Sequence, residues 1–495
     1  MRIRRVSLLI LPLMLISCKH NQNTSTSTEP ARDLIYDVSL PKVEDDCYDF
    51  GEKSFVDFPE FNTSNTDLSF DLSEDGTYYI VSNREYKLAS PTLIIPSSYN
   101  GLPVKEIAAE SFAYKTWLKT VYIPSSIEII RAGAFNGSSL QTVYYDAKNV
   151  QDLNGRNWVF FPSNTTTDQI DFYIGPNVER IPNRLLFPKN TEPSQKPLVK
   201  HLYFSKNSKL KEIGDYAFYG LSDTIVEALP DSVEKIGNYA FYQGNIDNLD
   251  LPKSLLSIGE HAFAFNPIEH IKFNSELSII DKNAFYNCDK LIKIDLKETK
   301  LETIEDNAFR NCTNVKEIVF NDELKSIGKR VFEGTEELVY VDLGKNITSI
   351  GENSFYNCVS LKAIRLNKNL KSIGNYAFFN AIKLEKLIVE SIKLDDFAAN
   401  NNIFSNVGVD SSNLLVAFTK GTTTIPARMF LSSSDETKNA QITRLVIEKT
   451  VTKIGEYAFF GIDTNVDYAG NMTEFTSIDI GNYNNTLSKV VCYNN

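Results

Sequence analysis

Four tyrosines stand between apolar neighbours in the first half of the chain. Tyr122, Tyr144, Tyr173 and Tyr203 occur in the triplets V-Y-I, V-Y-Y, F-Y-I and L-Y-F. Such alternation is typical of a β-strand, whose middle side chain points away from the face that its neighbours occupy. An outward-facing tyrosine offers apolar area and a polar tip, which suits contact with a protein or a glycan. We treat these four residues as candidate ligand-binding residues, the alternative being that tyrosine favours strands and stacks on its neighbours.

The cysteines are the next candidates for chemistry. Cys288, Cys312 and Cys358 each follow a phenylalanine by three residues, in Y-N-C, R-N-C and Y-N-C. A repeated small thiol that fills a niche in the core explains this spacing better than a metal site, which needs convergent ligands. A disulfide between Cys288 and Cys312 remains open.

Catalytic chemistry has little support in the sequence. The four histidines stand in no recognisable relation to a serine, cysteine or zinc motif, and there is no phosphate-binding loop, dinucleotide fingerprint or EF-hand. We predict no catalytic residue, no metal and no cofactor, and hence no enzyme. The net charge of −12 also makes nucleic acid a poor partner.

Phenylalanine recurs at similar intervals through most of the chain, and we call these positions the rungs of a ladder. The repeated segments that carry the rungs must position the residues discussed above. An isoleucine lies five residues ahead of most rungs, as in S-I-G-N-Y-A-F at 372–378, and a short apolar alternation such as L-K-A-I-R-L at 361–366 precedes it. Fifteen rungs at intervals of 22 to 32 residues indicate a solenoid, in which each coil buries its apolar residues against the next. The rungs are Phe112, Phe135, Phe160, Leu186 in place of phenylalanine, Phe218, Phe241, Phe263, Phe285, Phe309, Phe332, Phe355, Phe378, Phe404, Phe430 and Phe459.

The repeat can be written L-x-x-I-x-L-P-x-S-L-x-x-I-G-x-x-A-F-x-x-C, and I-D-N-L-D-L-P-K-S-L-L-S-I-G-E-H-A-F at 246–263 shows most of it. It predicts a β-rich α+β solenoid of about 15 coils, with short stacked strands and single helical turns. The repeat resembles that of the BspA-like bacterial leucine-rich repeat proteins over roughly 92–459. This resemblance implies a cell-surface or secreted protein that binds other macromolecules, in some members as an adhesin for host matrix proteins or other cells.

The first residues read as an export signal. Residues 1–17 have a basic start and then an apolar run that is too short to span a bilayer. The sequence L-I-S-C at 15–18 resembles the lipobox of bacterial lipoproteins, which implies cleavage before Cys18 and acylation of its thiol. The alternative is an ordinary signal peptide with an incidental cysteine. Acyl chains on Cys18 would make the membrane contact through a lipid anchor only.

The expected organisation follows in chain order. After the signal peptide (1–17) we expect a lipidated flexible tether (18–33), an N-terminal cap region with a β-hairpin around Asp75 and Gly76 (34–91), a solenoid (92–460) and a C-terminal cap (461–495). The predicted function is a non-catalytic, lipid-anchored protein of the cell envelope, on its outer surface, that acts as an adhesin for a protein or glycan ligand such as a host matrix protein. The alternative is an envelope scaffold or an accessory lipoprotein of a multiprotein complex.

Overall fold

The computed structural model describes residues 48–61, 68–83, 90–154, 158–161, 169–187, 199–392, 394–432 and 439–493. These residues belong to one compact unit, 40–495. The expected signal peptide and tether, with Cys18, lie outside the described residues.

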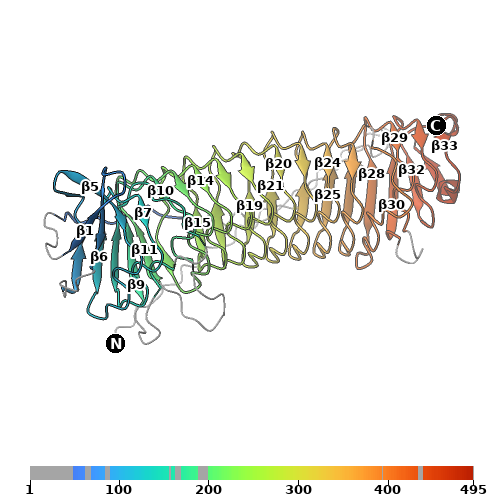
Figure 1. Ribbon diagram of the computed structural model, residues 1–495. Coiled ribbons are helices and arrows are strands. Elements are labelled where there is room, and N and C mark those ends of the chain that lie inside the picture. Colours follow the sequence, from blue (N-terminus) through green and yellow to red (C-terminus); the bar gives the residue numbers. More distant parts are fainter. Residues whose placement is uncertain are drawn as a thin grey trace, which may run out of the picture. The chain divides into compact units, whose positions relative to one another are not determined.

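Within this unit the chain winds into a β-solenoid whose coils stack one behind the other (Figure 1). Each regular coil contributes one strand to each of two rows, and consecutive strands within a row pair in parallel over most of the stack. The predicted leucine-rich repeat solenoid is therefore confirmed.

The first row holds the longer strands: β3 (Thr92–Ile94), β6 (Thr120–Ile123), β8 (Thr142–Tyr145), β9 (Ile170–Ile174), β11 (Val199–Phe204), β13 (Ile225–Val226), β15 (Asn248–Asp250), β17 (His270–Lys272), β19 (Lys293–Asp295), β21 (Glu317–Val319), β23 (Tyr340–Asp342), β25 (Ala363–Leu366), β27 (Lys386–Val389), β28 (Leu414–Phe418), β30 (Ile442–Ile447), β32 (Asn465–Tyr468) and β34 (Val490–Cys492). The second row holds β5 (Leu102–Ile107), β7 (Ile129–Ile130), β10 (Arg180–Ile181), β12 (Glu212–Ile213), β14 (Lys235–Ile236), β16 (Ser257–Ile258), β18 (Ile279–Ile280), β20 (Thr303–Ile304), β22 (Ser326–Ile327), β24 (Ser349–Ile350), β26 (Ser372–Ile373), β29 (Thr424–Ile425), β31 (Lys453–Ile454) and β33 (Asp479–Ile480).

The rung phenylalanines form a continuous spine inside the coils. Phe285, for example, is fully buried and stacks on Phe309 with ring centroids 5.2 Å apart, and Phe309 continues to Phe332 at 5.8 Å. A single coil could not bury such rings, so the core of each coil is completed by side chains of the neighbouring coils. This mutual burial explains why the phenylalanine ladder is so regular in the sequence.

The segment that carries each phenylalanine differs from the single helical turn that we predicted. It is a series of tight hydrogen-bonded turns, in which Ala377 N donates to Gly374 O and Phe379 N to Tyr376 O. Tyr376 has a φ of +59°, a left-handed conformation that cannot continue a helix. Among the described residues, the only α-helix is α1 (Met472–Thr476), followed by a 3₁₀ helix (Asn485–Lys489).

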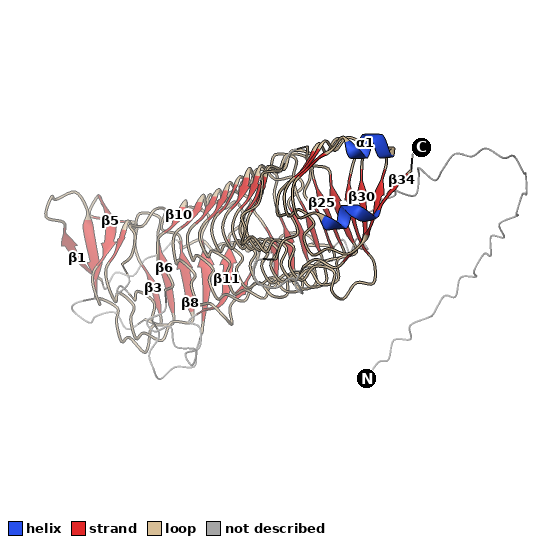
Figure 2. Ribbon diagram, turned by 90° about the vertical axis from the view of Figure 1, so that its right-hand side faces the viewer, coloured by secondary structure: helices blue, strands red, loops and turns tan. Residues whose placement is uncertain are grey.

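Additional elements close the two ends of the stack. At the N-terminal end, β1 (Ser69–Leu72) and β2 (Tyr79–Ser82) form an antiparallel hairpin with Gly76 in its turn, β2 pairs with β5, and β4 (Ser98–Tyr99) also pairs with β5. At the other end the stack continues past residue 460 through β32, β33 and β34, and α1 lies beside these last strands (Figure 2). The repeats therefore extend beyond the point where the sequence pattern fades.

Candidate binding surface

The four candidate tyrosines lie side by side on one face of the first row. The strands pair so that Tyr122 is opposite Tyr144, Tyr144 opposite Tyr173 and Tyr173 opposite Tyr203. The rings of Tyr144 and Tyr173 stack at 4.8 Å, and those of Tyr173 and Tyr203 at 4.7 Å. Their neighbours in the strands, such as Val143, are buried, whereas the tyrosines are only half-buried. The tyrosine face, as we call these four residues, therefore points away from the core.

Part of the tyrosine face is covered by a segment from the beginning of the described chain. Residues 48–61, which we call the strap, run back along the first row against the direction in which the coils succeed one another. Phe61 of the strap stacks on Tyr122 at 4.3 Å and lies 5.1 Å from Tyr144, while Phe58 meets Tyr144 edge-on at 5.7 Å. Two of the four tyrosines are thus already in contact with aromatic rings of the same chain.

A short backbone pairing fixes the middle of the strap. Val56 forms a parallel bridge with Ser205, just beyond the end of β11. The amide of Val56 donates to Phe204 O at 3.1 Å, and the amide of Lys206 donates to Val56 O at 2.9 Å. At the far end of the strap, Tyr48 stacks on His270 of β17 at 4.0 Å. The strap therefore reaches from β17 to β6.

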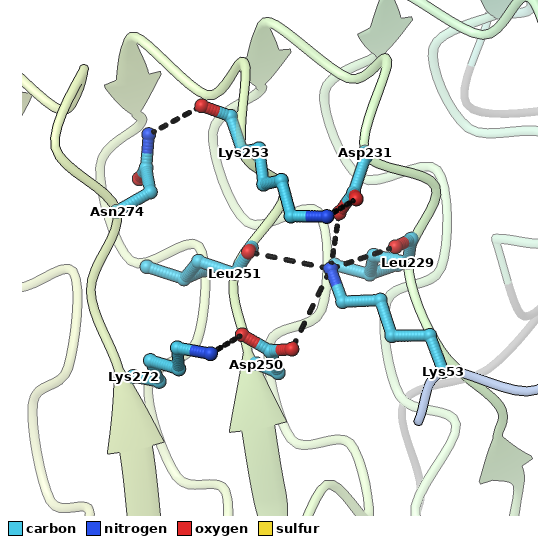
Figure 3. A network of polar contacts seen from close by, with 8 residues as sticks. All are labelled: Lys53, Leu229, Asp231, Asp250, Leu251, Lys253, Lys272 and Asn274. Atoms are coloured by element: carbon cyan, nitrogen blue, oxygen red, sulfur yellow. Dashed lines mark hydrogen bonds and ion pairs between the residues drawn. The ribbon is translucent and has the colours of Figure 1, made fainter. Parts of the chain in front are cut away.

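Lys53 makes the densest polar contacts of the strap (Figure 3). Its Nζ atom lies 2.6 Å from Asp231 Oδ1 and 3.8 Å from Asp250 Oδ2. The same ammonium donates to the main-chain oxygens of Leu229 and Leu251, both at 3.4 Å. With only 13% of its side chain exposed, Lys53 joins two successive coils.

An irregular coil explains why a cation fits at this place. β13 has only two residues and belongs to a different sheet from β15, so the hydrogen-bond ladder of the first row is interrupted between them, as it is again between β17 and β19 and between β21 and β23. The sequence E-A-L-P at 227–230 replaces the usual strand end, and Glu227 occupies a position where a core residue would be expected. Because Leu229 O and Leu251 O lie on either side of this break, the ammonium of Lys53 connects two coils that pair in the second row, through β14 and β16, but not in the first.

The sequence of the repeats decides the family. The profile of the BspA type leucine rich repeat region matches residues 90–185, 199–300, 279–410 and 423–490. The chain belongs to the BspA-type leucine-rich repeat family. Such proteins are typically found at the cell surface, and their repeats are typically non-catalytic binding scaffolds.

Solved structures of other repeat proteins resemble this BspA-type protein. A leucine-rich repeat protein from Bacteroides ovatus is 21% identical, with a TM-score of 0.40, over 66% of this chain and 94% of its own. The pneumococcal vaccine antigen PcpA is 18% identical, with a TM-score of 0.38, over 88% of this chain and 97% of its own. A leucine rich cell surface protein from Faecalibacterium prausnitzii is 17% identical, with a TM-score of 0.31, over 85% of this chain and 98% of its own. No curated protein sequence matches this chain.

The tyrosine face of this BspA-type protein is uncharged at neutral pH. Burial raises the pKa of Tyr122 and of Tyr173 to about 12, and it also raises the pKa of Tyr144 and of Tyr203. Burial has this effect because it disfavours the phenolate. The four hydroxyl groups therefore stay protonated and able to donate hydrogen bonds to a ligand.

The repeated cysteines fill niches in the core, as predicted. The thiols of Cys288, Cys312 and Cys358 are buried and unpaired. Each donates to the main-chain oxygen of a rung phenylalanine, for example Cys288 to Phe263 O at 3.3 Å. A disulfide between Cys288 and Cys312 is thus not formed in this structure. Over the described ranges, no group of three or more histidine, cysteine or acidic residues is arranged to hold a metal ion.

The sequence did not reveal the strap as part of the site, although its aromatic residues were visible. Tyr48, Phe50, Phe55, Phe58 and Phe61 follow no repeat period. Five aromatic residues in 14 positions were the available signal, because so many rings in one short segment indicate that it packs against another surface.

In the part of the chain that the structure describes, helices are too short and too polar to cross a membrane.

Proposed function

We propose that this chain is a lipid-anchored adhesin that recognises a protein or glycan partner, such as a host matrix protein, through the tyrosine face. Family membership supports a binding role at the cell surface. The observation that carries the proposal is the register of four outward-facing tyrosines on consecutive strands. Rigid, amphipathic rings in a row give a large contact area at low cost in side-chain entropy.

Strap rings contact Tyr122 and Tyr144, whereas the ring contacts of Tyr173 and Tyr203 are with other rings of the first row. A partner could use the half formed by Tyr173 and Tyr203 at once and reach the other half only when the strap moves. Binding energy in protein interfaces is usually concentrated in a few aromatic residues. We therefore expect the double change Tyr173→Ser and Tyr203→Ser to weaken binding at least tenfold, and the change of all four tyrosines to abolish it.

The test measures binding of the chain without its first 17 residues to purified matrix proteins and to a glycan array, by surface plasmon resonance. The matched control changes Tyr219 and Tyr242 to serine, a pair that stacks at 5.0 Å on the turns outside both strand rows. This control should leave binding unchanged. Equal binding by the wild type and the fourfold variant, with circular dichroism showing an intact fold, would rule out the tyrosine face as the binding surface.

Anchoring through Cys18 is tested separately on whole cells. We expect Cys18→Ala to release the protein from the membrane fraction, because acylation of the thiol supplies the attachment. Protease shaving of intact cells should cut the repeats if they face outward. Repeats that resist the protease on intact cells but are cut after lysis would favour an envelope scaffold that faces inward.

A further inference from the structure

The strap contacts the first row in the way that a bound peptide would. It is extended, it contributes backbone hydrogen bonds at Val56, it places the cation Lys53 among acidic and carbonyl oxygens, and it lays Phe61 on Tyr122. Main-chain pairing combined with side-chain contacts is a common mode of peptide recognition. The strap therefore shows which chemistry this face accepts.

The fit of the strap is incomplete. No residue of the strap is fully buried. A cavity of about 250 Å³ remains between the strap and the strands β13 and β15, and Asn248 is among the residues that line it. The buried Oδ1 atom of Asn248 has no hydrogen-bond partner, which costs free energy in a folded protein. A segment that filled this cavity and donated a hydrogen bond to Asn248 would match the surface better than the strap does.

The place of this imperfect contact is specific. The cavity lies at the irregular coil, where the ladder between β13 and β15 is interrupted and where Asp231 and Asp250 face Lys53. Lys253 and Lys272 also pair with these carboxylates, but without the strap the oxygens of Leu229 and Leu251 would lose the cation between them, beside an aromatic face. Such a surface is complementary to a cation that is flanked by aromatic groups.

We propose that the strap is a displaceable cover, and that the partner of the first row is an extended peptide with a lysine or arginine between aromatic residues. This inference rests on the proposed function and narrows its ligand from a protein or glycan to a peptide segment. The partner takes the place of the strap, fills the cavity beside Asn248 and gains access to Tyr122 and Tyr144. Because the strap is part of the same chain, its high effective concentration keeps the surface closed to weak or unrelated ligands.

The experiment uses a fluorescein-labelled peptide with the strap sequence Y-D-F-G-E-K-S-F-V-D-F-P-E-F as the probe, with fluorescence anisotropy as the readout. The chains compared are the wild type and a variant with Lys53→Met and Phe61→Ala, both lacking the first 17 residues. We expect the variant to bind the peptide at least tenfold more tightly than the wild type does, because its own strap competes less well. A control peptide that carries the same two changes should bind to neither chain.

A second pair of changes locates the bound peptide. Adding Asp231→Asn and Tyr122→Ser to the strap variant should reduce peptide binding at least tenfold, whereas adding Tyr219→Ser and Tyr242→Ser should not. Hydrogen exchange at the amide of Val56 gives a readout that needs no peptide: it should be faster in the strap variant, while exchange at the amide of Phe309 stays slow.

Two results would overturn the proposal. The first is equal peptide affinity for the wild type and the strap variant, with the amide of Val56 protected from exchange as strongly as that of Phe309 in both. This result would show that the strap is a permanent part of the fold. A concentration-dependent dimer of the wild type that the strap changes abolish would instead identify the strap of a second copy as the occupant. Because no matrix protein or glycan enters this assay, its failure is distinct from a failure of the tyrosine face to bind such ligands.

Discussion

Replacing Lys53 by methionine tests the contact that holds the strap most directly. Methionine keeps an apolar chain of similar length but removes the ammonium and its hydrogen bonds. Charge-assisted hydrogen bonds contribute about 1.5 to 3 kcal/mol when sheltered from water, whereas exposed ion pairs contribute about 0 to 1 kcal/mol. Lys53 is 13% exposed, but its partner Asp231 is 36% exposed and also pairs with Lys253. We therefore expect a loss near the lower limit, about 1.5 kcal/mol.

A loss of this size corresponds to roughly a tenfold larger fraction of open strap. The assay is hydrogen exchange at the amide of Val56, whose rate under native conditions reports local opening. The matched control is Lys206→Met, since Lys206 pairs with Asp57 of the same strap but both side chains are largely exposed. This control should change the exchange rate less than about twofold.

Two results would refute this reasoning. Unchanged exchange at Val56 in Lys53→Met would mean that the lysine contacts contribute nothing to docking. Equal acceleration by the two lysine changes would mean that net charge, and not the burial of Lys53 between two coils, determines the stability of the docked strap.

Three further predictions concern the core, the thiols and acidity. Phe309→Ala should lower the free energy of unfolding by about 3–5 kcal/mol in guanidinium titrations, because it interrupts the stacked spine; a loss below about 1 kcal/mol would contradict a shared core. Burial raises the pKa of Cys288 to about 12, so this thiol should react with Ellman's reagent at pH 8 only after denaturation. In a chain with Cys18 and Cys47 replaced by serine, the partly exposed Cys492 should react first, and Cys492→Ser should remove that phase. Burial acts to raise the pKa of Asp231, but hydrogen bonds from Lys253 and Lys53 outweigh it and lower the pKa overall. The ionised carboxylate of Asp231 therefore stabilises the docked strap fully above about pH 4, and this stabilisation is lost as the pH falls through the lowered pKa. Strap opening should therefore increase between pH 5 and pH 3 more in the wild type than in Asp231→Asn; equal increases would contradict the role of this carboxylate.

The spine and the orientation of the tyrosines were predictable from the sequence because both follow from local patterns. Each rung repeats the same apolar spacing, and Val143 and Tyr144 alternate as inward and outward residues of a strand do. The turn around Tyr376 was mispredicted as helical because a short apolar segment after glycine looks alike in both conformations, and only the left-handed φ separates them.

The strap could not be predicted, for a physical reason that differs from the one for the turns. Lys53 and Asp231 are 178 residues apart, and nothing in the local sequence of either specifies the other. The irregular E-A-L-P coil was recognisable as a departure from the repeat, but its consequence depends on a distant cation. Contacts between an aperiodic segment and a repeat array are set by tertiary structure alone.

If the chain is anchored through Cys18, as we propose, the position of Tyr48 determines where the anchored segment meets the solenoid. Since Tyr48 stacks on His270, the covalent link to residue 47 is made beside β17, several coils inside the stack. Detachment of the strap, as proposed above, would move this point to the hairpin at the N-terminal end, and the 14 freed residues would add up to about 50 Å of reach. The solenoid would then be attached at its N-terminal end and no longer at its side. Binding of a partner would therefore also change how far the repeats extend from the anchor.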